Sequence, residues 1–582
     1  YDPRLLVLVN GRQVYLDHYG MTNWAGLGVQ LEEVQQIEII RGPNSALFGF
    51  NAVSGVVNII TINPLQTEQL VTSVEGGTKG YGRLSQSAAI RLADRLGIRL
   101  SGGYEKSDEL AGLNGSTLAP QYGTIDPRKV EAAGELYGAI DDRTNGSLSA
   151  SYSDSRYLVV SHALLTIPTS YEFGSVGARV LHDTGWGLLS GQVLHNWSNL
   201  DIAIPVIPGG VTVRNEVSIA SADALVRAGA ANTLRFGLEY RRDQLRTVPG
   251  YPGLTRYAIY AASAMWERRL GDAITVTAAA RIDHLTLDQS GVVDQPTIFT
   301  KADFDRSIAA FSFNSAILFK LDDTSSLRVA ASRGIQAPSL DAFGTRVQYN
   351  IPGLPIPYVA SGNPAIRPAI ITSAEIGFNH SFEAMSSRLE LTAFYNRTTD
   401  IISLSAPQTP PIATPPAYPF ILAAADNVGS FTAFGVEASL TGRFGQAWRW
   451  ALNYSWTRAE QNIVGNMDGR FDWPLALDSA TPEHKIKAQI SYEHGAWLAT
   501  TAARYTSAIA QLVEIPVTPT TGGPLTLVAI KQSVALDAKL AFKASSGVTL
   551  SVAGENLTGA RGTGLSPAPA ERRLRGAVQI SF

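Results

Sequence analysis

The sequence predicts a mainly β protein: a large transmembrane antiparallel β-barrel, preceded by a small α/β domain at the N-terminus. Three observations lead to this fold class. From about residue 67 onward, apolar residues occupy every second position in segment after segment. No run of about 18 apolar residues, the length that a helical membrane span needs, occurs in the 582 residues. Residues 1–65 have a different, mixed pattern.

The alternation has a period of two, which is typical of strands with two unlike faces. In residues 448–457 one face carries Trp448, Trp450, Leu452, Tyr454 and Trp456, and the other carries Arg449, Ala451, Asn453, Ser455 and Thr457. The same pattern recurs in residues 274–283 and 485–493 and in the last five residues.

Alternation alone fits two architectures, because a soluble sandwich also has one apolar and one polar face on each strand. The composition of the faces favours a membrane barrel. The apolar face is rich in Trp and Tyr at strand ends, as in the aromatic girdles of such barrels, and the polar face holds Lys, Arg, Glu and Gln, which a wet lumen would solvate. The soluble β-sandwich stays an alternative.

Several function classes are disfavoured by composition. The 47 basic and 50 acidic residues give no electrostatic footprint for nucleic acid. The absence of cysteine excludes a disulfide scaffold, thiolate zinc sites and thiol catalysis. The Gly-x-Ser-x-Gly, His-Glu-x-x-His, Walker and Gly-x-Gly-x-x-Gly motifs are also absent. We therefore expect no enzyme, cofactor or metal site, although a hydrolytic site assembled only in three dimensions would escape this search.

Connections between the predicted strands are uneven, and short and long ones belong on opposite rims of a barrel. The longest predicted excursions are residues 108–135, 286–306, 342–364, 402–428 and 458–482. Prolines mark the fourth of them, since proline cannot sit in a central strand. They are Pro407, Pro410, Pro411, Pro415, Pro416 and Pro419.

Residues 1–65 predict a small mixed α/β domain, and residues 66–582 the barrel. An apolar run over residues 5–9 is followed by Asn10 and Gly11, a strong hairpin signal, and by a second extended piece through Leu16. A helical turn is predicted over residues 31–34, then strands over 37–40 and 56–61. So small a domain would be marginal alone, so we expect it to pack inside or against the barrel.

These residues carry a family resemblance. The runs LLVLVNGRQVYLDHYGMTNW (5–24) and VQLEEVQQIEIIRGPNSALFGFNAVSGVVNIIT (29–61) closely resemble the plug of TonB-dependent receptors. In the barrel, five short segments resemble family motifs in the family's order, and the chain ends on an aromatic residue, Phe582. The segments are SRGIQAP (332–338), GNPAIRP (362–368), GVE (435–437), TPEH (481–484) and ENL (555–557).

The resemblance implies a barrel of about 22 strands that is closed by the plug and lies in the bacterial outer membrane, among outer-membrane lipid and lipopolysaccharide. It implies active import of a scarce nutrient by a monomer that is driven by the TonB–ExbB–ExbD complex. A ferric siderophore or similar chelate is the leading cargo, with cobalamin or a saccharide as alternatives. A complete plug would carry roughly as many residues again before Tyr1, including the TonB box.

The resemblance also suggests site residues. Arg41, in the Arg-Gly-Pro segment, would meet the barrel-wall glutamates Glu375 and Glu437 and latch the plug, and a solvated arginine at a turn is the alternative. Residues 17–24 would form an apical loop facing the external vestibule. Its ligand-binding candidates are His18, Tyr19, Asn23 and Trp24, unless Tyr19 and Trp24 pack the plug against the wall. His18 has no second His nearby, so we expect no metal site.

A passive porin or adhesin is the rival from another class, because it would share the barrel. It would have no use for a separately folded plug, so residues 1–65 argue against it. Use of the protein by phages or colicins is compatible with the transporter interpretation.

Overall fold

The computed structural model describes residues 5–16, 18, 20–108, 126–160, 166–203, 210–248, 251–291, 298–349, 355–404, 419–463, 476–514, 525–559 and 571–582. In these ranges no helix has the length and apolar character to cross a membrane.

The N-terminal domain is built on a four-stranded sheet in the order β2-β1-β6-β5. Its strands are β1 (Leu5–Val9), β2 (Arg12–Gln13), β5 (Val34–Arg41) and β6 (Gly55–Thr61). β1 pairs with β6 in parallel and with β2 in antiparallel, across a turn in which Asn10 and Gly11 have φ of 52° and 78°. The predicted Asn-Gly hairpin is therefore confirmed, since such turns need positive φ at both positions.

Short elements complete this domain. They are β3 (Tyr15–Leu16), β4 (Met21–Thr22), η1 (Trp24–Gly26), η2 (Leu31–Glu33) and α1 (Ser45–Phe48). The apolar run of β1 is explained by burial on both faces: Leu6 and Leu8 pack with Val56, while Val7 and Val9 pack with Ile59. The predicted boundary at residue 65 falls within the connection of residues 62–68 between β6 and the next strand, β7.

Within the described residues, twenty-two strands form a closed antiparallel barrel, and β32 pairs with β7 to close the ring. The barrel strands are β7 (Gln69–Gly77), β8 (Gly82–Ala93), β9 (Leu96–Lys106), β10 (Arg128–Ala139), β11 (Thr144–Val160), β12 (Thr166–Asp183), β13 (Gly187–Ile202), β14 (Val211–Ala228), β15 (Asn232–Val248), β16 (Tyr251–Leu270), β17 (Ile274–Ser290), β18 (Arg306–Lys320), β19 (Ser325–Gln336), β22 (Ala369–Phe382), β23 (Ser387–Leu404), β24 (Ile421–Phe444), β25 (Trp448–Ile463), β26 (His484–His494), β27 (Trp497–Thr506), β30 (Ser533–Ser545), β31 (Val548–Glu555) and β32 (Arg573–Ser581).

The two rims differ as predicted. Connections such as residues 271–273 and 445–447 define a short-turn rim, and the connections on the opposite side define a long-loop rim. Several predicted excursions were too wide, because β17 continues to Ser290 and β25 to Ile463. Strands of this length exceed the roughly 9 to 11 residues that cross a bilayer, so their outer parts lose the apolar outward face, although inward residues such as Leu285 and Leu287 of β17 stay apolar. Five of the six marker prolines, at 407 to 416, lie outside the described residues.

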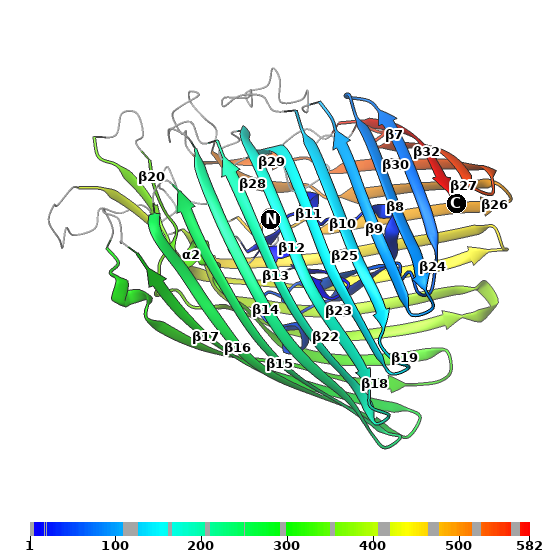
Figure 1. Ribbon diagram of the computed structural model, residues 1–582, viewed down its shortest axis with the longest axis horizontal. Helices are drawn as coiled ribbons and strands as arrows, with labels where there is room; N and C mark the ends of the chain where they lie inside the picture. Colours follow the sequence, from blue (N-terminus) through cyan, green and yellow to red (C-terminus); the bar gives the residue numbers. More distant parts are fainter. Residues whose placement is uncertain are drawn as a thin grey trace.

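Outward and inward faces separate along every long strand. On β15 the outward Leu238 is exposed, whereas the inward Arg241 and Asp243 are buried against the lumen contents. One ring with apolar outward side chains contradicts the soluble sandwich, which would bury its apolar face between two sheets. Figure 1 shows the first strands, in dark blue, behind the wall strands β11 to β14, inside the barrel.

Near the long-loop rim, part of the lumen is filled by the protein's own apolar side chains. Inward residues of β14 to β19 pack against α2 (Leu340–Gly344) and η4 (Lys301–Phe304), and Leu340 and Phe343 are fully buried. Three further features lie between barrel strands: the hairpins β20 (Arg346–Tyr349) with β21 (Tyr358–Ser361) and β28 (Ile509–Glu514) with β29 (Leu525–Ile530), and the 3-10 turn η5 (Glu383–Met385). The segment between β19 and β22 therefore folds over the plug.

Candidate functional site: the interface between plug and barrel wall

Arg41 ends β5 and reaches the wall of the barrel. Its Nη1 lies 2.5 Å from Oε2 of Glu437, in the middle of β24. The two side chains are 64% and 39% exposed, so water screens this ion pair. The structure thus brings together two of the three residues predicted to form the latch, in a contact of modest strength.

Glu375 lies beside the same plug segment without meeting Arg41. Its carboxylate is held by Arg328 Nη2 at 2.8 Å, both residues being on the wall. A Cβ built on Gly42 would lie 2.9 Å from Glu375 Oε1, and Gly42 has φ of 76°. The glycine after Arg41 therefore suits both a left-handed backbone and close approach to this glutamate.

The most deeply buried ion pair between plug and wall among the described residues was missed from the sequence. Glu33 in η2 forms a salt bridge with Arg99 on β9, and Arg99 Nη2 also lies 2.9 Å from Glu135 Oε2 on β10. All three side chains are buried. Ser101 Oγ and the backbone N–H of Gln30 donate to Glu33 Oε1 at 2.9 and 2.8 Å, so the carboxylate is well satisfied.

A second cluster adjoins it through the neighbouring glutamate. Arg83 on β8 pairs with Glu32 at 2.8 Å and with Glu75 at 2.6 Å, and Gln30 Nε2 donates to Glu131 at 2.6 Å. Burial alone would raise the pKa of Glu32, but the hydrogen bonds and charge of Arg83 lower it overall. Residues 30–33 thus anchor the start of β5 to three wall strands.

On another side of the plug, β2 meets a buried charged group on β15 to β17. Gln13 Oε1 accepts from Arg241 at 2.5 Å, and Glu239 lies between Arg241 and Arg281 at 3.2 and 3.3 Å. Gly49 packs closely on Arg281, since a Cβ there would lie 2.8 Å from its guanidinium. Burial lowers the pKa of Arg12, also on β2, to about 10, well above neutral pH.

Uncharged hydrogen bonds fix α1 to the wall. Asn314 Nδ2 on β18 donates to the carbonyl of Pro43 at 2.5 Å, and the backbone N–H of Ile335 on β19 donates to Ser45 Oγ at 3.2 Å. The N–H of Asn51 in turn donates to the carbonyl of Ile335 at 3.1 Å. The Arg-Gly-Pro segment and the helix after it are therefore bonded to β18 and β19.

The predicted apical residues have different surroundings. Trp24 is 54% exposed and is the one candidate whose side chain is accessible among those the structure describes. Asn23 is buried, and its Oδ1 accepts from the N–H of Ala25 at 3.1 Å, which caps η1. Tyr19 lies outside the described residues. Of the described candidates, Trp24 therefore has an accessible side chain, whereas Asn23 is engaged in holding the turn.

His18 is fully buried, against the prediction of an accessible side chain. Its carbonyl accepts from the N–H of Asp341 in α2 at 3.0 Å, so the segment between β19 and β22 covers it. Burial lowers the pKa of His18 to about 4, despite an opposing hydrogen bond with Asn215. His18 is therefore neutral at neutral pH and links the plug apex to α2.

The sequence does contain a signal for the charged plug and wall residues that were missed. Gln30, Glu32 and Glu33 are polar residues just before β5, and Arg83 and Arg99 lie on the inward face of alternating strands. Buried inward charges need partners, either on the plug or on neighbouring strands. Which charge meets which depends on the rotation of the plug in the barrel, and strand periodicity does not fix that rotation.

Two family models match the chain. The model described as "TonB dependent receptor-like, beta-barrel" matches residues 76–557, and "TonB-dependent Receptor Plug Domain" matches residues 2–56. A curated relative, the vitamin B12 transporter BtuB of Vibrio vulnificus, is 28% identical over 106 residues. That alignment spans 18% of this chain and 17% of the relative.

Solved structures share the fold over the whole chain. The siderophore receptor PirA of Acinetobacter baumannii superimposes with a TM-score of 0.77 at 18% identity, covering 100% of this chain and 91% of PirA. The FrpB iron transporter of Neisseria meningitidis superimposes with a TM-score of 0.75 at 12% sequence identity. The superposition covers 100% of this chain and 92% of FrpB. The ferric enterobactin receptor PfeA of Pseudomonas aeruginosa, in complex with enterobactin, superimposes with a TM-score of 0.75 at 15% sequence identity. The superposition covers 100% of this chain and 92% of PfeA.

Proposed function

The chain belongs to the TonB-dependent receptors, and from that premise we propose that it imports a ferric siderophore or a similar metal chelate across the Gram-negative outer membrane. The observation that carries the proposal is a plug bonded across the lumen of a closed barrel. A passive pore would be obstructed by such a domain, whereas a gated importer requires it. Solved structures with the same fold include receptors and transporters of iron compounds.

The contacts between plug and wall support a gating role. On the side of β8 to β10 the plug is held by buried ion pairs, and at β24 by the exposed pair of Arg41 and Glu437. Because exposed ion pairs contribute about 0 to 1 kcal/mol, the Arg41 contact can break at low cost, while the buried side holds. We propose that Arg41 and Glu437 form the releasable latch, with Glu375 kept in place by Arg328.

Energy would come from the periplasm through TonB with ExbB and ExbD, since an outer membrane holds no ion gradient or nucleotide supply of its own. The barrel would lie in the bacterial outer membrane as a monomer, among its lipid and lipopolysaccharide, with the long-loop rim outside. Catalysis is not part of the proposal, and the family's members are receptors and transporters.

Cobalamin is the second candidate cargo, because the curated relative with the local match transports vitamin B12. Trp24 is the residue that we propose to contact either ligand, since indole rings stack on extended ligands and its side chain is accessible.

Ligand binding by the purified receptor tests the proposal. The protein with its native N-terminus would be titrated with ferric siderophores, the same siderophores without iron, cobalamin and a maltodextrin, and intrinsic tryptophan fluorescence would be recorded. We expect saturable quenching by one ferric chelate, weaker binding of its iron-free form, and reduced quenching in Trp24→Phe. Binding of cobalamin alone would select the second candidate, and saturable binding of the maltodextrin alone would contradict both.

A further inference from the structure

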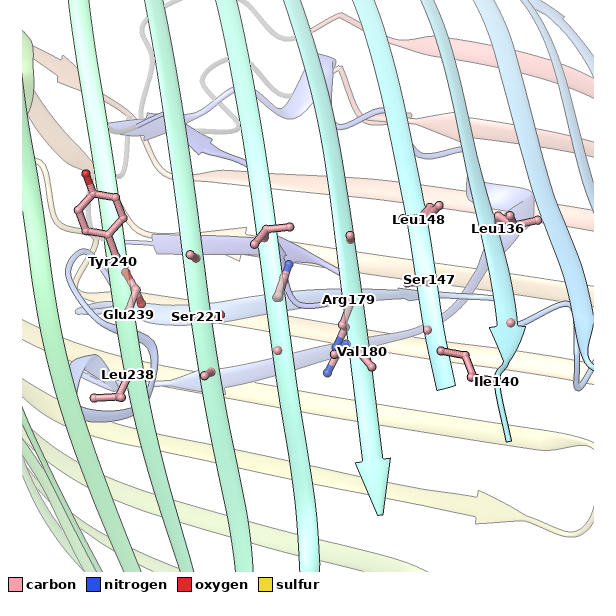
Figure 2. Close-up of a pocket in the computed structure, with 18 of the residues that line it drawn as sticks. Leu136, Ile140, Ser147, Leu148, Arg179, Val180, Ser221, Leu238, Glu239 and Tyr240 are labelled. Atoms are coloured by element: carbon pink, nitrogen blue, oxygen red, sulfur yellow. The ribbon is translucent and has the colours of Figure 1, made fainter. Parts of the chain in front are cut away.

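A small cavity lies between the plug and the inner wall of β9 to β13. Its volume is about 30 Å³, which accommodates about two water molecules or one small ion. The plug contributes residues of the turn between β1 and β2 and residues around Gly28, and the wall contributes inward residues of its five strands. The pocket in Figure 2 lies on the same stretch of wall and shares Ser147 and Arg179 with this cavity.

The cavity exists because the wall residues opposite Arg12 are small. Ser149 on β11 pairs with Gly177 on β12, and Ser151 occupies the next inward position on β11. On the plug, Gly28 has φ of 65°, and a Cβ there would lie 3.2 Å from Ser151 Cβ. The plug backbone therefore approaches the wall closely, while the short wall side chains leave space beside it.

Positive charge dominates the lining of this cavity. Arg12, Arg99 and Arg179 line it, and Glu135 is the one acidic side chain among the described lining residues. Glu33 lies next to the cavity and pairs with Arg99. Three arginines are thus balanced by two glutamates, which leaves one positive charge without a counter-charge.

Arg12 is buried without an ion-pair partner. It is 8% exposed, and its Nη1 donates to Ser151 Oγ at 2.9 Å. In the described part of the chain no carboxylate forms an ion pair with it. Burial lowers the pKa of Arg12 to about 10, Glu135 opposes this effect and Arg99 adds to it, so the side chain stays charged at neutral pH. A guanidinium has five N–H donors, and a buried charge that lacks a partner is costly.

The cavity contains further donors that the protein leaves unused. Arg99 is 5% exposed, and its Nε has no hydrogen-bond partner among the described residues. Within the same ranges, the hydroxyls of Ser147 and Ser149 donate to no protein group. Arg179 donates to the carbonyl of Asn10 at 3.2 Å and is exposed, close to the end of β12 at the short-turn rim. The cavity is therefore rich in donors and reached by solvent at Arg179.

We propose that this cavity binds a small monovalent anion, such as chloride, which joins Arg12 of the plug to Arg99 and Arg179 of the wall. One such ion balances the excess positive charge and accepts hydrogen bonds from the unused donors. Water would satisfy the donors but would leave the charge of Arg12 without a counter-charge. An organic ligand needs a pocket of about 300 Å³ or more, so it does not fit.

The anion acts as a clip between the plug and the barrel. It holds the turn between β1 and β2 to the wall, and it loses Arg12 as a partner when the plug is displaced. Because the site is formed by plug and wall alone, the proposal is independent of the cargo and of TonB.

Diffraction with bromide tests whether the cavity holds an anion. The receptor with its native N-terminus would be crystallised in sodium bromide, since bromide resembles chloride and its anomalous scattering distinguishes it from water. We expect an anomalous peak in the cavity, within hydrogen-bond distance of Arg12. Density for water alone would overturn the proposal.

Hydrogen exchange in solution tests the clip at ordinary salt concentrations. Amides in residues 5–14 would be followed in sodium chloride and in sodium gluconate of equal ionic strength, because gluconate is too large for the cavity. We expect exchange in the parent to be at least about threefold slower in chloride, since the ion binds the seated plug. Equal exchange in both salts would overturn the proposal.

Two variants complete this experiment. Arg12→Gln should exchange at the same rate in chloride and in gluconate, whereas the control Arg95→Gln, which removes an exposed pair with Asp142, should keep the difference. Each variant is compared with itself in two salts, so a general loss of stability does not mimic the result. An Arg12 variant that keeps the full chloride effect would contradict the assignment.

Discussion

Arg99 and Arg41 both bridge plug and wall, yet burial separates their energetic roles. Arg99 lies buried between Glu33 and Glu135, whereas Arg41 and Glu437 are both exposed. Removing one partner of a buried pair leaves an uncompensated charge, while an exposed pair exchanges its partner for water. The holding contact and the releasable contact are therefore different residues.

Arg99→Met is predicted to weaken the anchoring of η2 by about 3 to 5 kcal/mol, because Glu33 and Glu135 lose their shared cation. Hydrogen exchange of the amides in residues 31–41 would report the change. Arg41→Met should cost at most about 1 kcal/mol in the same experiment. The matched control is Arg95→Met, which removes an exposed pair with Asp142 at the end of the same strand. An Arg99 variant with unchanged exchange would show that the buried pair does not hold the plug.

His18 gives the plug apex a predicted acid sensitivity. Its pKa falls from the ordinary value of 6.5 to about 4 on folding, so the unfolded segment takes up a proton before the folded one does. The contribution to stability is complete above pH 6.5 and is lost as the pH falls toward 4, by about 3 kcal/mol.

Asp341 opposes this trend, because burial raises its pKa and favours the folded form at acid pH. The contribution of His18 is therefore the difference between the parent and His18→Gln. Amide protection of residues 339–345 should fall faster with acid in the parent than in the variant. Parallel pH profiles would contradict the assignment.

Sequence reasoning identified Arg41 and Glu437 because both lie in recognisable motifs. It missed Glu33 and Arg99, whose contact depends on how the plug is rotated in the barrel. It also placed His18 at an open loop, since nothing local in the sequence reveals that α2 covers it. The motifs show where these residues lie in the sequence. Whether their side chains are buried or exposed depends on packing between distant segments, which the motifs do not reveal.

The segment between β19 and β22 is the element that links the outer rim to the plug. Leu340 and Phe343 of α2 fill the apolar part of the lumen, and the N–H of Asp341 bonds to the plug. Gly362 permits this arrangement, because a Cβ there would lie 2.4 Å from the backbone N of Gly344. Close packing against α2 thus explains why the first residue of the Gly-Asn-Pro motif is glycine.

Gly362→Ala is accordingly predicted to displace α2 without unfolding the barrel. Limited proteolysis and hydrogen exchange should show opening confined to residues 337–368 and to the region of His18, while the heat-resistant mobility of the barrel on gels is retained. Gly576→Ala on β32 is the control, since a Cβ there meets nothing within 4 Å. Identical proteolysis of both variants would contradict a close contact at Gly362.

At the level of elements, the sequence predicted which strands and turns exist better than it predicted where each strand ends. Period two revealed the strands and Asn10-Gly11 the hairpin, but the ends of β17 and β25 were placed too early. The outer parts of these strands lie beyond the hydrocarbon, where the outward face is polar and the periodic signal weakens, although Leu287 of β17 is still apolar and buried. β20 and β21 were missed because they form a hairpin inside a connection predicted as a loop.

The whole molecule combines a wide barrel with a domain that obstructs it. Many inward side chains of the wall are polar or charged, so the lumen would hold water if the plug were absent. A gated importer and a passive pore with the same barrel differ in this one respect.

Deletion of residues 1–61 is predicted to convert the receptor into a passive pore. In planar bilayers the deleted form should show large steady conductance, and the parent with its native N-terminus should show almost none. Swelling of liposomes in a small sugar provides a second measurement. Conductance of the parent equal to that of the deleted form would favour the porin alternative.

Energy-dependent uptake tests the central claim most directly. A receptor-deleted Gram-negative host would carry the gene with its native N-terminus, and accumulation of radiolabelled ferric siderophores and cobalamin would be measured with and without TonB. The account predicts accumulation of one ferric chelate that requires both this receptor and TonB. Uptake that is equal in the presence and absence of TonB would contradict it.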